Sequence, residues 1–427
     1  MILCFYIVFF YYRHFTRINP LPGPIPIPII GIFMVNNDLI DQINKLSKIY
    51  GHNGIFEFYL AGYRQIVITK AEYAKKFLAP STKECKIYWK RFPLKLEVFE
   101  DHGINQLGLA FNENFNYWKF YRQIYMQAIG KLSNSNRTTK LLNELFEELS
   151  NYWLDLTGNN YNSGVIDLTA WTKRFLTDLM FLLSTGKRSF AIKYCYLKLK
   201  NEKVTKEIMD SEHYIESLTY FLVNIRMAFV PKFLRRLPLI RNHVDKFMDV
   251  RNFLFERILE NVREKRKEIE EIGSNDNFDT KQLEDDSLTS FIIVNTPYES
   301  HPQKRPMNDI EISSILFDAL TGSTDSVCIM KYREGDKVAS AFSFVLYDIA
   351  HNPAAKIKLL DEINSVIGDD LTRQITLDDL EKLKYCEATV LESLRMRSPT
   401  AMLSRYNTEP DEVAGYKWPP NTSFLMN

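Results

Sequence analysis

The sequence has little of what marks a fibrous, disordered or nucleic-acid-binding chain. Its 427 residues include only 16 Gly and 17 Pro, which excludes a collagen-like or low-complexity protein and disfavours a turn-dense β-sandwich. The 54 basic and 53 acidic residues leave a net charge of +1, so we expect no nucleic-acid partner. Apolar residues, in contrast, are abundant: 45% of the chain is hydrophobic and 13% is aromatic, enough for a large core.

Cysteine is also scarce, and its spacing excludes two kinds of stabilisation. The five cysteines are odd in number, far apart and form no CxxC pair. None of the seven histidines lies in an HExxH motif. A structural zinc site or a disulfide framework needs clusters, so the thiols are interpreted as reduced and mostly buried, and no residue is assigned as a metal ligand. The cysteines are Cys4, Cys85, Cys195, Cys328 and Cys386.

The N-terminal hydrophobic run is shorter than a membrane span. Residues 2–12 are uninterruptedly apolar and Arg13, His14 and Arg17 follow, but a membrane span needs about 20 apolar residues. The segment lacks the leading charge and the cleavage site of a secretory signal. We expect residues 1–19 to be a short membrane anchor or its remnant, with the basic residues holding the main domain on the cytosolic side. Folding of this segment into the core is the alternative.

Alternate prolines mark the next segment, residues 20–31. Prolines between Pro20 and Pro28 remove backbone donors and fix φ, so this segment is expected to be extended and stiff. It suits a hinge between the anchor and a large domain over residues 32–427. A proline-rich recognition ligand is the alternative.

The remaining pattern predicts a mainly α protein with a small β part. Asp41–Tyr50 is amphipathic, and Ile55–Thr69 has the β-branched and aromatic residues of two short strands. Helical patterns dominate from about Phe115 to Arg397, the longest from Val244 to Glu271. The mixed charges at Arg263–Glu268 indicate a solvated helix face.

Two local patterns suggest chemistry. Trp118 and Arg122, at i and i+4, share a helix face, where an indole donor and a guanidinium could hold a carboxylate. Ordinary cation–π packing is the alternative. In the apolar helix Asn308–Val327, the polar stretch Gly322–Ser326 suits proton delivery to a bound ligand. The alternative is that the helix ends there, with Asp325 or Ser326 capping the next one.

Two weaker patterns lie nearer the C-terminus. Glu392 and Arg395, at i and i+3, can pair, and their apolar neighbours suggest partial burial. Arg405 lies in irregular chain before a strand–turn–strand pattern at residues 410–422. It could reach back to a site, although arginines in loops are usually solvated.

In this order the patterns resemble the cytochrome P-450 family of haem-thiolate monooxygenases, in its membrane-anchored eukaryotic form, from Pro20 to Asn427. The resemblance implies the P-450 fold, mainly α with a small β part. It implies a haem-dependent monooxygenase that inserts one oxygen atom from O2 into a lipophilic small-molecule substrate. Electrons would come from an NAD(P)H-dependent reductase, so that NADPH acts indirectly. The expected location is the endoplasmic reticulum membrane, with the catalytic domain facing the cytosol.

The resemblance also implies residue roles. Asp325 is implied as the catalytic acid, and Ser326 supplies a hydroxyl where the family usually has threonine. The regions from Arg91 to Gly108 and from Asp210 to Phe233 are implied to line or cover the substrate pocket. The haem-binding residues are implied to be Trp118, Arg122, Gly322 and Arg405. Glu392 and Arg395 are implied to be a structural pair that holds the core behind the haem.

Two departures from the family pattern carry consequences. Residues 328–338 interrupt the motif helix, which suggests a retained intron, with a true insertion as the alternative. The sequence reaches Asn427 before the family's haem-binding loop, and no cysteine of the printed chain lies in such a loop. An axial thiolate favours O–O cleavage. We therefore interpret the chain as a C-terminally truncated member, expected to be inactive as such. The alternative is a non-catalytic helical remnant or scaffold that does not bind haem.

Overall fold

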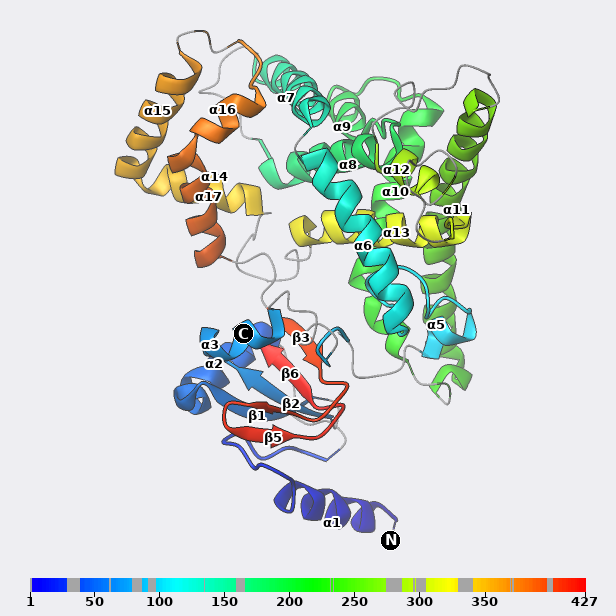
Figure 1. Cartoon of the computed structure of the whole chain (residues 1–427), viewed down its shortest axis with the longest axis vertical. Helices are drawn as coiled ribbons and strands as arrows, with labels where there is room; N and C mark the ends of the chain where they lie inside the picture. Colours follow the sequence, from blue (N-terminus) through cyan, green and yellow to red (C-terminus); the bar gives the residue numbers. More distant parts are fainter. Residues whose placement is uncertain are drawn as a thin grey trace. The chain divides into compact units, whose positions relative to one another are not determined.

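The computed structural model describes residues 2–28, 39–60, 63–78, 87–90, 97–133, 135–158, 166–230, 232, 234–273, 286–294, 296, 305–328, 341–368, 370, 372–397 and 402–427. These residues belong to two compact units (Figure 1). The first comprises residues 1–95 and 400–427, and the second comprises residues 96–399. Each unit is described by itself.

The first unit contains a mixed four-stranded sheet in the order β1-β2-β6-β3. Strand β2 is parallel to β6, and the other two pairings are antiparallel. Strands β4 and β5 form a separate hairpin. The strands are β1 (Ile55–Leu60), β2 (Tyr63–Ile68), β3 (Leu403–Tyr406), β4 (Asp411–Val413), β5 (Tyr416–Trp418) and β6 (Ser423–Met426). The helices of this unit are α1 (Ile2–Phe15), α2 (Leu39–Tyr50), the 3-10 turn η1 (Gly51–Asn53) and α3 (Ala71–Leu78).

Both faces of this sheet are covered at β2, which explains why the consecutive residues Ile66, Val67 and Ile68 are all apolar and buried. On one face Ile66 and Ile68 pack with Phe77 of α3. On the other, Val67 packs with Ile43 of α2. Successive strand residues point to opposite faces, so both sets must be hydrophobic when helices cover both sides.

The two strands expected within Ile55–Thr69 are confirmed as β1 and β2. The expectation of irregular chain at Leu403–Arg405 is wrong, because these residues form β3. Strand β3 pairs with β6, so that Ser404 lies opposite Leu425. Such pairing between separated segments leaves no strong local signal in a four-residue strand.

The proline-rich segment lies along β1, to which it is hydrogen-bonded. The backbone N–H of Glu57 donates to the carbonyl of Pro22 at 2.9 Å, and Leu21 is buried. A Cβ atom on Gly23 would lie only 2.0 Å from the Glu57 carbonyl oxygen, so the close approach of the two chains requires glycine there. The described part of the segment, up to Pro28, contains no helix, in line with the expected extended conformation.

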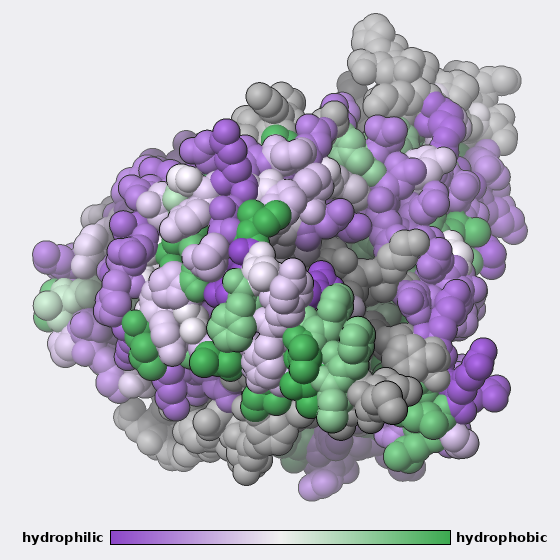
Figure 2. All heavy atoms as spheres, turned by 90° about the horizontal axis from the view of Figure 1, so that it is seen from below, coloured by the Kyte–Doolittle hydropathy of each residue, from purple (hydrophilic) through white to green (hydrophobic). Residues whose placement is uncertain are grey.

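Helix α1 leaves most of its apolar side chains exposed. Phe5, Val8 and Phe15 are 75%, 68% and 68% exposed, whereas Phe10 contacts Tyr59 of β1. Figure 2 shows apolar side chains gathered among polar ones on the side where α1 lies. Among the described helices, none is both long enough and apolar enough to cross a membrane.

The second unit is entirely helical in its described part. Its α-helices are α5 (Glu97–Asp101), α6 (Phe115–Ser133), α7 (Asn136–Leu156), α8 (Leu168–Thr185), α9 (Ala191–Leu199), α10 (Lys206–Val223), α11 (Pro238–Gly273), α12 (Ser287–Ile293), α13 (Asp309–Cys328), α14 (Ala341–His351), α15 (Pro353–Ile367), α16 (Leu377–Lys382) and α17 (Lys384–Met396). Two 3-10 turns, η2 (Ile225–Phe229) and η3 (Leu234–Arg236), precede α11. The expected mainly α architecture with a small β part is confirmed.

Helix α13 forms the centre of this unit and packs against α8, α10, α11 and α12 (Figure 1). Its residues Ile312, Ile315 and Leu316 are at most 1% exposed. The long helix expected from Val244 begins earlier, at Pro238. Proline suits that first position, where its missing N–H has no partner to lose.

The sequence pattern predicted that the charged stretch Arg263–Glu268 of α11 is solvated. In the structure part of it is buried. Lys265 is 5% exposed and its Nζ lies 3.7 Å from a carboxylate oxygen of Asp286, which is 1% exposed. Asp286 also caps α12 by accepting a hydrogen bond from the backbone N–H of Thr289. The expectation is wrong for Lys265 because α12 covers this part of α11, which charge alternation does not reveal.

Candidate functional site

Helix α6 brings Trp118 and Arg122 together as their spacing predicts. Trp118 is 5% exposed, and the Arg122 guanidinium lies 5.2 Å from the centre of its indole ring. Arg122 itself is exposed and has no hydrogen bond or ion pair with any residue that the structure describes. The cation–π contact therefore fixes the arginine stem while its donors remain available to an anion.

A hydrogen-bond network centred on the buried Glu311 ties this part of α6 to α13. Tyr121 donates to Oε1 of Glu311 at 2.7 Å. The same carboxylate accepts two hydrogen bonds from Arg305, at 2.5 and 2.8 Å, and one from the backbone N–H of Asn308 at 3.0 Å. The network sets the position of α6, and so of the neighbouring Arg122, relative to α13.

The ionisation of this network follows from its contacts. Burial alone would raise the pKa of Glu311, but the hydrogen bonds from Arg305, Asn308 and Tyr121 outweigh it and lower that pKa. Burial and the adjacent carboxylate together raise the pKa of Tyr121. Glu311 is therefore an anion and Tyr121 a neutral donor at neutral pH.

Helix α13 continues through the polar stretch, so the alternative that it ends at Gly322 is wrong. Leu320 and Thr321 are buried, whereas Gly322 is exposed and a Cβ atom there would meet no atom of the described residues within 4 Å. Among the described residues, none therefore covers the helix at this glycine. The side chains of Asp325 and Ser326 lie outside the described residues, as do residues 329–340, which hold most of the suspected insertion.

Glu392 and Arg395 form the predicted pair on α17, with two hydrogen bonds of 2.7 Å. Their side chains are 57% and 70% exposed, so the expectation of partial burial is wrong. The apolar neighbours Leu391 and Met396 are themselves 60% and 51% exposed. No described residue covers this face of α17, and an exposed pair contributes little stability.

Arg405 lies on β3, half-buried, and donates to the carbonyl of Ser404 at 2.8 Å. It therefore belongs to the first unit. Trp118, Arg122 and Gly322 belong to the second.

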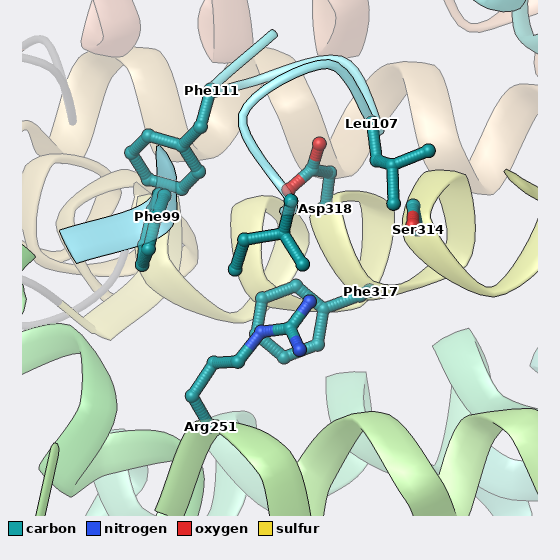
Figure 3. A pocket seen from close by; sticks show the side chains of 8 residues that line it. Phe99, Leu107, Phe111, Arg251, Ser314, Phe317 and Asp318 are labelled. Atoms are coloured by element: carbon teal, nitrogen blue, oxygen red, sulfur yellow. The ribbon is translucent and has the colours of Figure 1, made fainter. Parts of the chain in front are cut away.

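The second unit contains a cavity that the sequence only partly predicted (Figure 3). Phe99, Ile104 and Leu107 come from the expected region Arg91–Gly108, but no lining residue comes from Asp210–Phe233. Sequence reasoning missed Arg251 of α11, which also lines it. A signal was present, since the residues three and four positions on either side are apolar: Phe247, Met248, Leu254 and Phe255.

Comparison with known proteins identifies the family. The family model for cytochrome P450 matches residues 21–427. The chain belongs to the cytochrome P450 family.

The relatives fit this assignment along the chain. The chain is 25% identical to cytochrome P450 705A1 of Arabidopsis thaliana, over 100% of this chain and 75% of the relative. It is 23% identical to 2-hydroxyisoflavanone synthase of Glycyrrhiza echinata, over 96% of this chain and 70% of that protein. Cytochrome P450 4d2 of Drosophila melanogaster is 33% identical over 31% of this chain and 29% of its own length.

Membership supports a haem-dependent monooxygenase that uses O2 and takes electrons from a reductase using NADPH. The family also implies a lipophilic substrate. Eukaryotic P450 relatives are typically membrane-bound.

The described residues fit part of a haem site. The Arg122 donors have no partner among the described residues and suit a propionate, and no described residue occupies the space that a Cβ atom on Gly322 would face. A thiolate ligand is not found among the described thiols: burial raises the pKa of both Cys195 and Cys386, and Cys4 is exposed on α1. The side chains of Cys85 and Cys328 lie outside the described residues. We assign no residue of this sequence to the iron.

Proposed function

We propose that Trp118 and Arg122 bind a haem propionate in this P450 and that the Gly322–Ser326 segment faces the oxygen-binding side of the haem. Arg405 is proposed to contact a propionate, and Glu392 with Arg395 to support the core behind the haem. Haem iron, when bound, supplies the activation of O2. The product is a lipophilic substrate carrying one added oxygen atom.

The observation that carries this proposal is the position of the Arg122 guanidinium, which lies against Trp118 with its donors unpartnered among the described residues. Its aromatic neighbour is buried and holds the guanidinium in place, yet its donors have no partner among the described side chains. A propionate is a carboxylate, and a guanidinium binds a carboxylate through charge-assisted hydrogen bonds. The glycine at position 322 supports the second part, because a flat group can approach a helix closely where the helix itself projects no side chain.

Asp325 and Ser326 are proposed to move protons. A carboxylic acid and a hydroxyl one residue apart can pass a proton from solvent to a reacting group, and serine keeps the hydroxyl needed for this step. The continuity of α13 through Cys328 supports their placement on the same helix as Gly322.

One experiment with two variants tests these roles. We expect the wild-type chain to take up haem, and Arg122→Gln to weaken haem binding about tenfold or more, since a hydrogen bond to a charged group contributes about 1.5–3 kcal/mol. Ser326→Ala should retain haem affinity, and in a chain extended by the family's haem-binding loop it should release more peroxide per NADPH oxidised in the presence of a reductase. The measurements are a haem titration, a carbon monoxide difference spectrum and peroxide yield.

The outcomes separate the possible errors. Equal haem affinity of wild type and Arg122→Gln would refute the propionate role, and unchanged peroxide yield in Ser326→Ala would refute the proton role. A wild-type chain that takes up no haem would favour a non-catalytic helical protein. Lys119→Gln, an exposed neighbour on α6, is the matched control for Arg122.

Attachment to the endoplasmic reticulum membrane, with the catalytic domain facing the cytosol, is proposed through residues 1–19. The exposed Phe5, Val8 and Phe9 of α1 support it, because aromatic and aliphatic side chains on one helix can enter the membrane interface without spanning it. Deletion of residues 2–15 is expected to move the chain from the microsomal pellet to the supernatant. Retention in the pellet would contradict this proposal.

A further inference from the structure

Helix α1 contacts strand β1 through a buried histidine in its last turn. The His14 side chain is 6% exposed, and its ring centre lies 5.4 Å from that of Tyr59 on β1. One turn earlier, Phe10 contacts the same tyrosine, with 6.0 Å between the ring centres. Residues four apart share a helix face, so these two side chains dock one face of α1 on β1.

The polar part of the His14 ring has no matching partner. Its Nδ1 atom is buried and forms no hydrogen bond with any described residue. Phenylalanine would make the same ring contacts without burying a nitrogen atom, so packing alone is a poor explanation for histidine here. Histidine differs from phenylalanine in one further respect, because it takes up a proton between about pH 5 and 8.

The charged groups that face His14 are mainly cationic. Arg17 donates a hydrogen bond to the backbone carbonyl of His14, and Arg64 approaches from β2. Among the described residues the acid that faces His14 is Glu57 on β1, and its two carboxylate oxygens already accept hydrogen bonds from Arg17 and Arg64. Burial and Glu57 raise the pKa of Tyr59, which is therefore neutral at neutral pH. A proton on His14 adds a third positive charge to a site with one negative charge.

These surroundings disfavour a charged imidazole while α1 is docked. Burial, followed by the charge of Arg17 and then that of Arg64, outweighs the opposing effect of Glu57 and lowers the pKa of His14. Away from β1 the imidazole is hydrated and has its ordinary pKa of about 6.5. The released helix thus binds the proton more readily than the docked helix. Docking is complete above about pH 6.5 and weakens as the pH falls from there through the lowered pKa of the docked state.

We propose that His14 is a pH-sensitive latch whose protonation releases α1 from β1. At neutral pH the latch fixes the apolar helix to the first unit, and in mild acid it leaves the helix free to change its angle to β1. The sheet does not depend on this contact, since its strands are paired with one another. The latch is a contact within the first unit, so it is independent of haem binding and of membrane attachment.

Hydrogen exchange of the purified full chain in detergent-free buffer, from about pH 7.5 to about pH 5, tests the latch. Each rate is expressed as protection relative to the unfolded chain at the same pH. A released helix of 14 residues is marginal in water, so its amides lose protection on release. Uptake of one proton changes the docking equilibrium by at most about tenfold per pH unit. The α1 amides of wild type are expected to lose protection by about threefold to tenfold as the pH falls, while those of β2 keep theirs.

Two variants assign the effect to His14. His14→Phe keeps a ring against Tyr59 and should make the protection of α1 independent of pH. His52→Phe is the matched control, because His52 is an exposed histidine of the same unit, and it should show the pH dependence of wild type. Protection of α1 that does not change with pH in wild type would overturn the proposal, and so would an equal loss in His14→Phe.

A measurement on wild type keeps the test decisive if His14→Phe does not fold. The titration of the His14 ring, followed by NMR, should coincide with the loss of protection in α1. A His14 ring that becomes protonated while α1 stays fully protected would contradict the latch.

Failure of this proposal is distinguishable from failure of the proposed function. A chain that takes up haem but shows the same α1 protection at every pH would lose only the latch. A chain that releases α1 in acid but takes up no haem would keep the latch and lose the monooxygenase assignment.

Discussion

Replacing Glu57 by Ala is expected to lower the free energy of unfolding of the first unit by about 3 kcal/mol, because it leaves a buried charge network without its acid. Glu57 is 2% exposed and accepts a hydrogen bond from Nε of Arg17, at 2.5 Å, and from Nε of Arg64, at 2.8 Å. Arg17 and Arg64 are 15% and 21% exposed, so water can replace only part of the hydrogen bonding that they lose with the Glu57 carboxylate.

The same residue fixes the proline-rich segment on β1. Arg64 also donates to the carbonyls of Ile18 and Asn19, at 2.7 and 2.5 Å. Loss of Glu57 should therefore loosen the segment between α1 and β1 as well as the sheet. Hydrogen exchange in this segment is expected to rise together with the loss of stability.

Urea unfolding and hydrogen exchange in β1 and β2 measure this effect. Glu72→Ala, at an exposed position of α3, is the matched control and should change stability by less than about 0.5 kcal/mol. A Glu57→Ala chain as stable as the control would show that Arg17 and Arg64 are satisfied by water, and the network would then have no structural role.

Replacing Glu311 by Gln is expected to cost about 2 kcal/mol at neutral pH, since it removes the charge that holds Tyr121 and Arg305. The pKa of Glu311 is lowered in the folded protein, so the unfolded chain binds the proton more readily. The stabilisation by Glu311 is thus complete above the ordinary glutamate pKa of about 4.5 and is lost as the pH falls through the lowered folded pKa.

The free energies of unfolding of wild type and Glu311→Gln are expected to converge in acid. Urea unfolding from about pH 7 to about pH 3 should show wild type more stable at the higher pH, with the difference shrinking below about pH 4.5. Glu260→Gln, on the exposed face of α11, should follow wild type throughout. A wild-type advantage that persists unchanged in acid would mean that packing, and not charge, accounts for the effect.

The Glu311 substitution also bears on the haem site. Tyr121 precedes Arg122 on α6, and Glu311 lies on the same helix as Gly322. The network therefore joins the two helices that carry the proposed propionate donor and Gly322. Loss of this network should change the spacing between α6 and α13 without unfolding either helix.

Much of the helical site followed from local spacing. Residues four apart share a helix face whatever surrounds them, so the contact between Trp118 and Arg122 was predictable. The long α11 and central α13 were likewise visible as apolar periodicity. The pairing of Glu392 with Arg395 followed in the same way.

Burial could not be predicted by the same reasoning, because it depends on what covers a residue from elsewhere in the chain. Lys265 looked solvated but is covered by α12, and Glu392 looked half-buried but is exposed. Arg251 was passed over in a long charged helix, although apolar residues flank it on its own face.

The sequence by itself therefore determined the family, the mainly α class and the residues that helical spacing places side by side. Only the tertiary structure decided which charges are buried, that β3 pairs with β6, and that the loop after α5 meets α11 and α13 around Arg251. The reason is physical: helical neighbours are set by 3.6 residues per turn, whereas burial and strand pairing join segments that can be hundreds of residues apart.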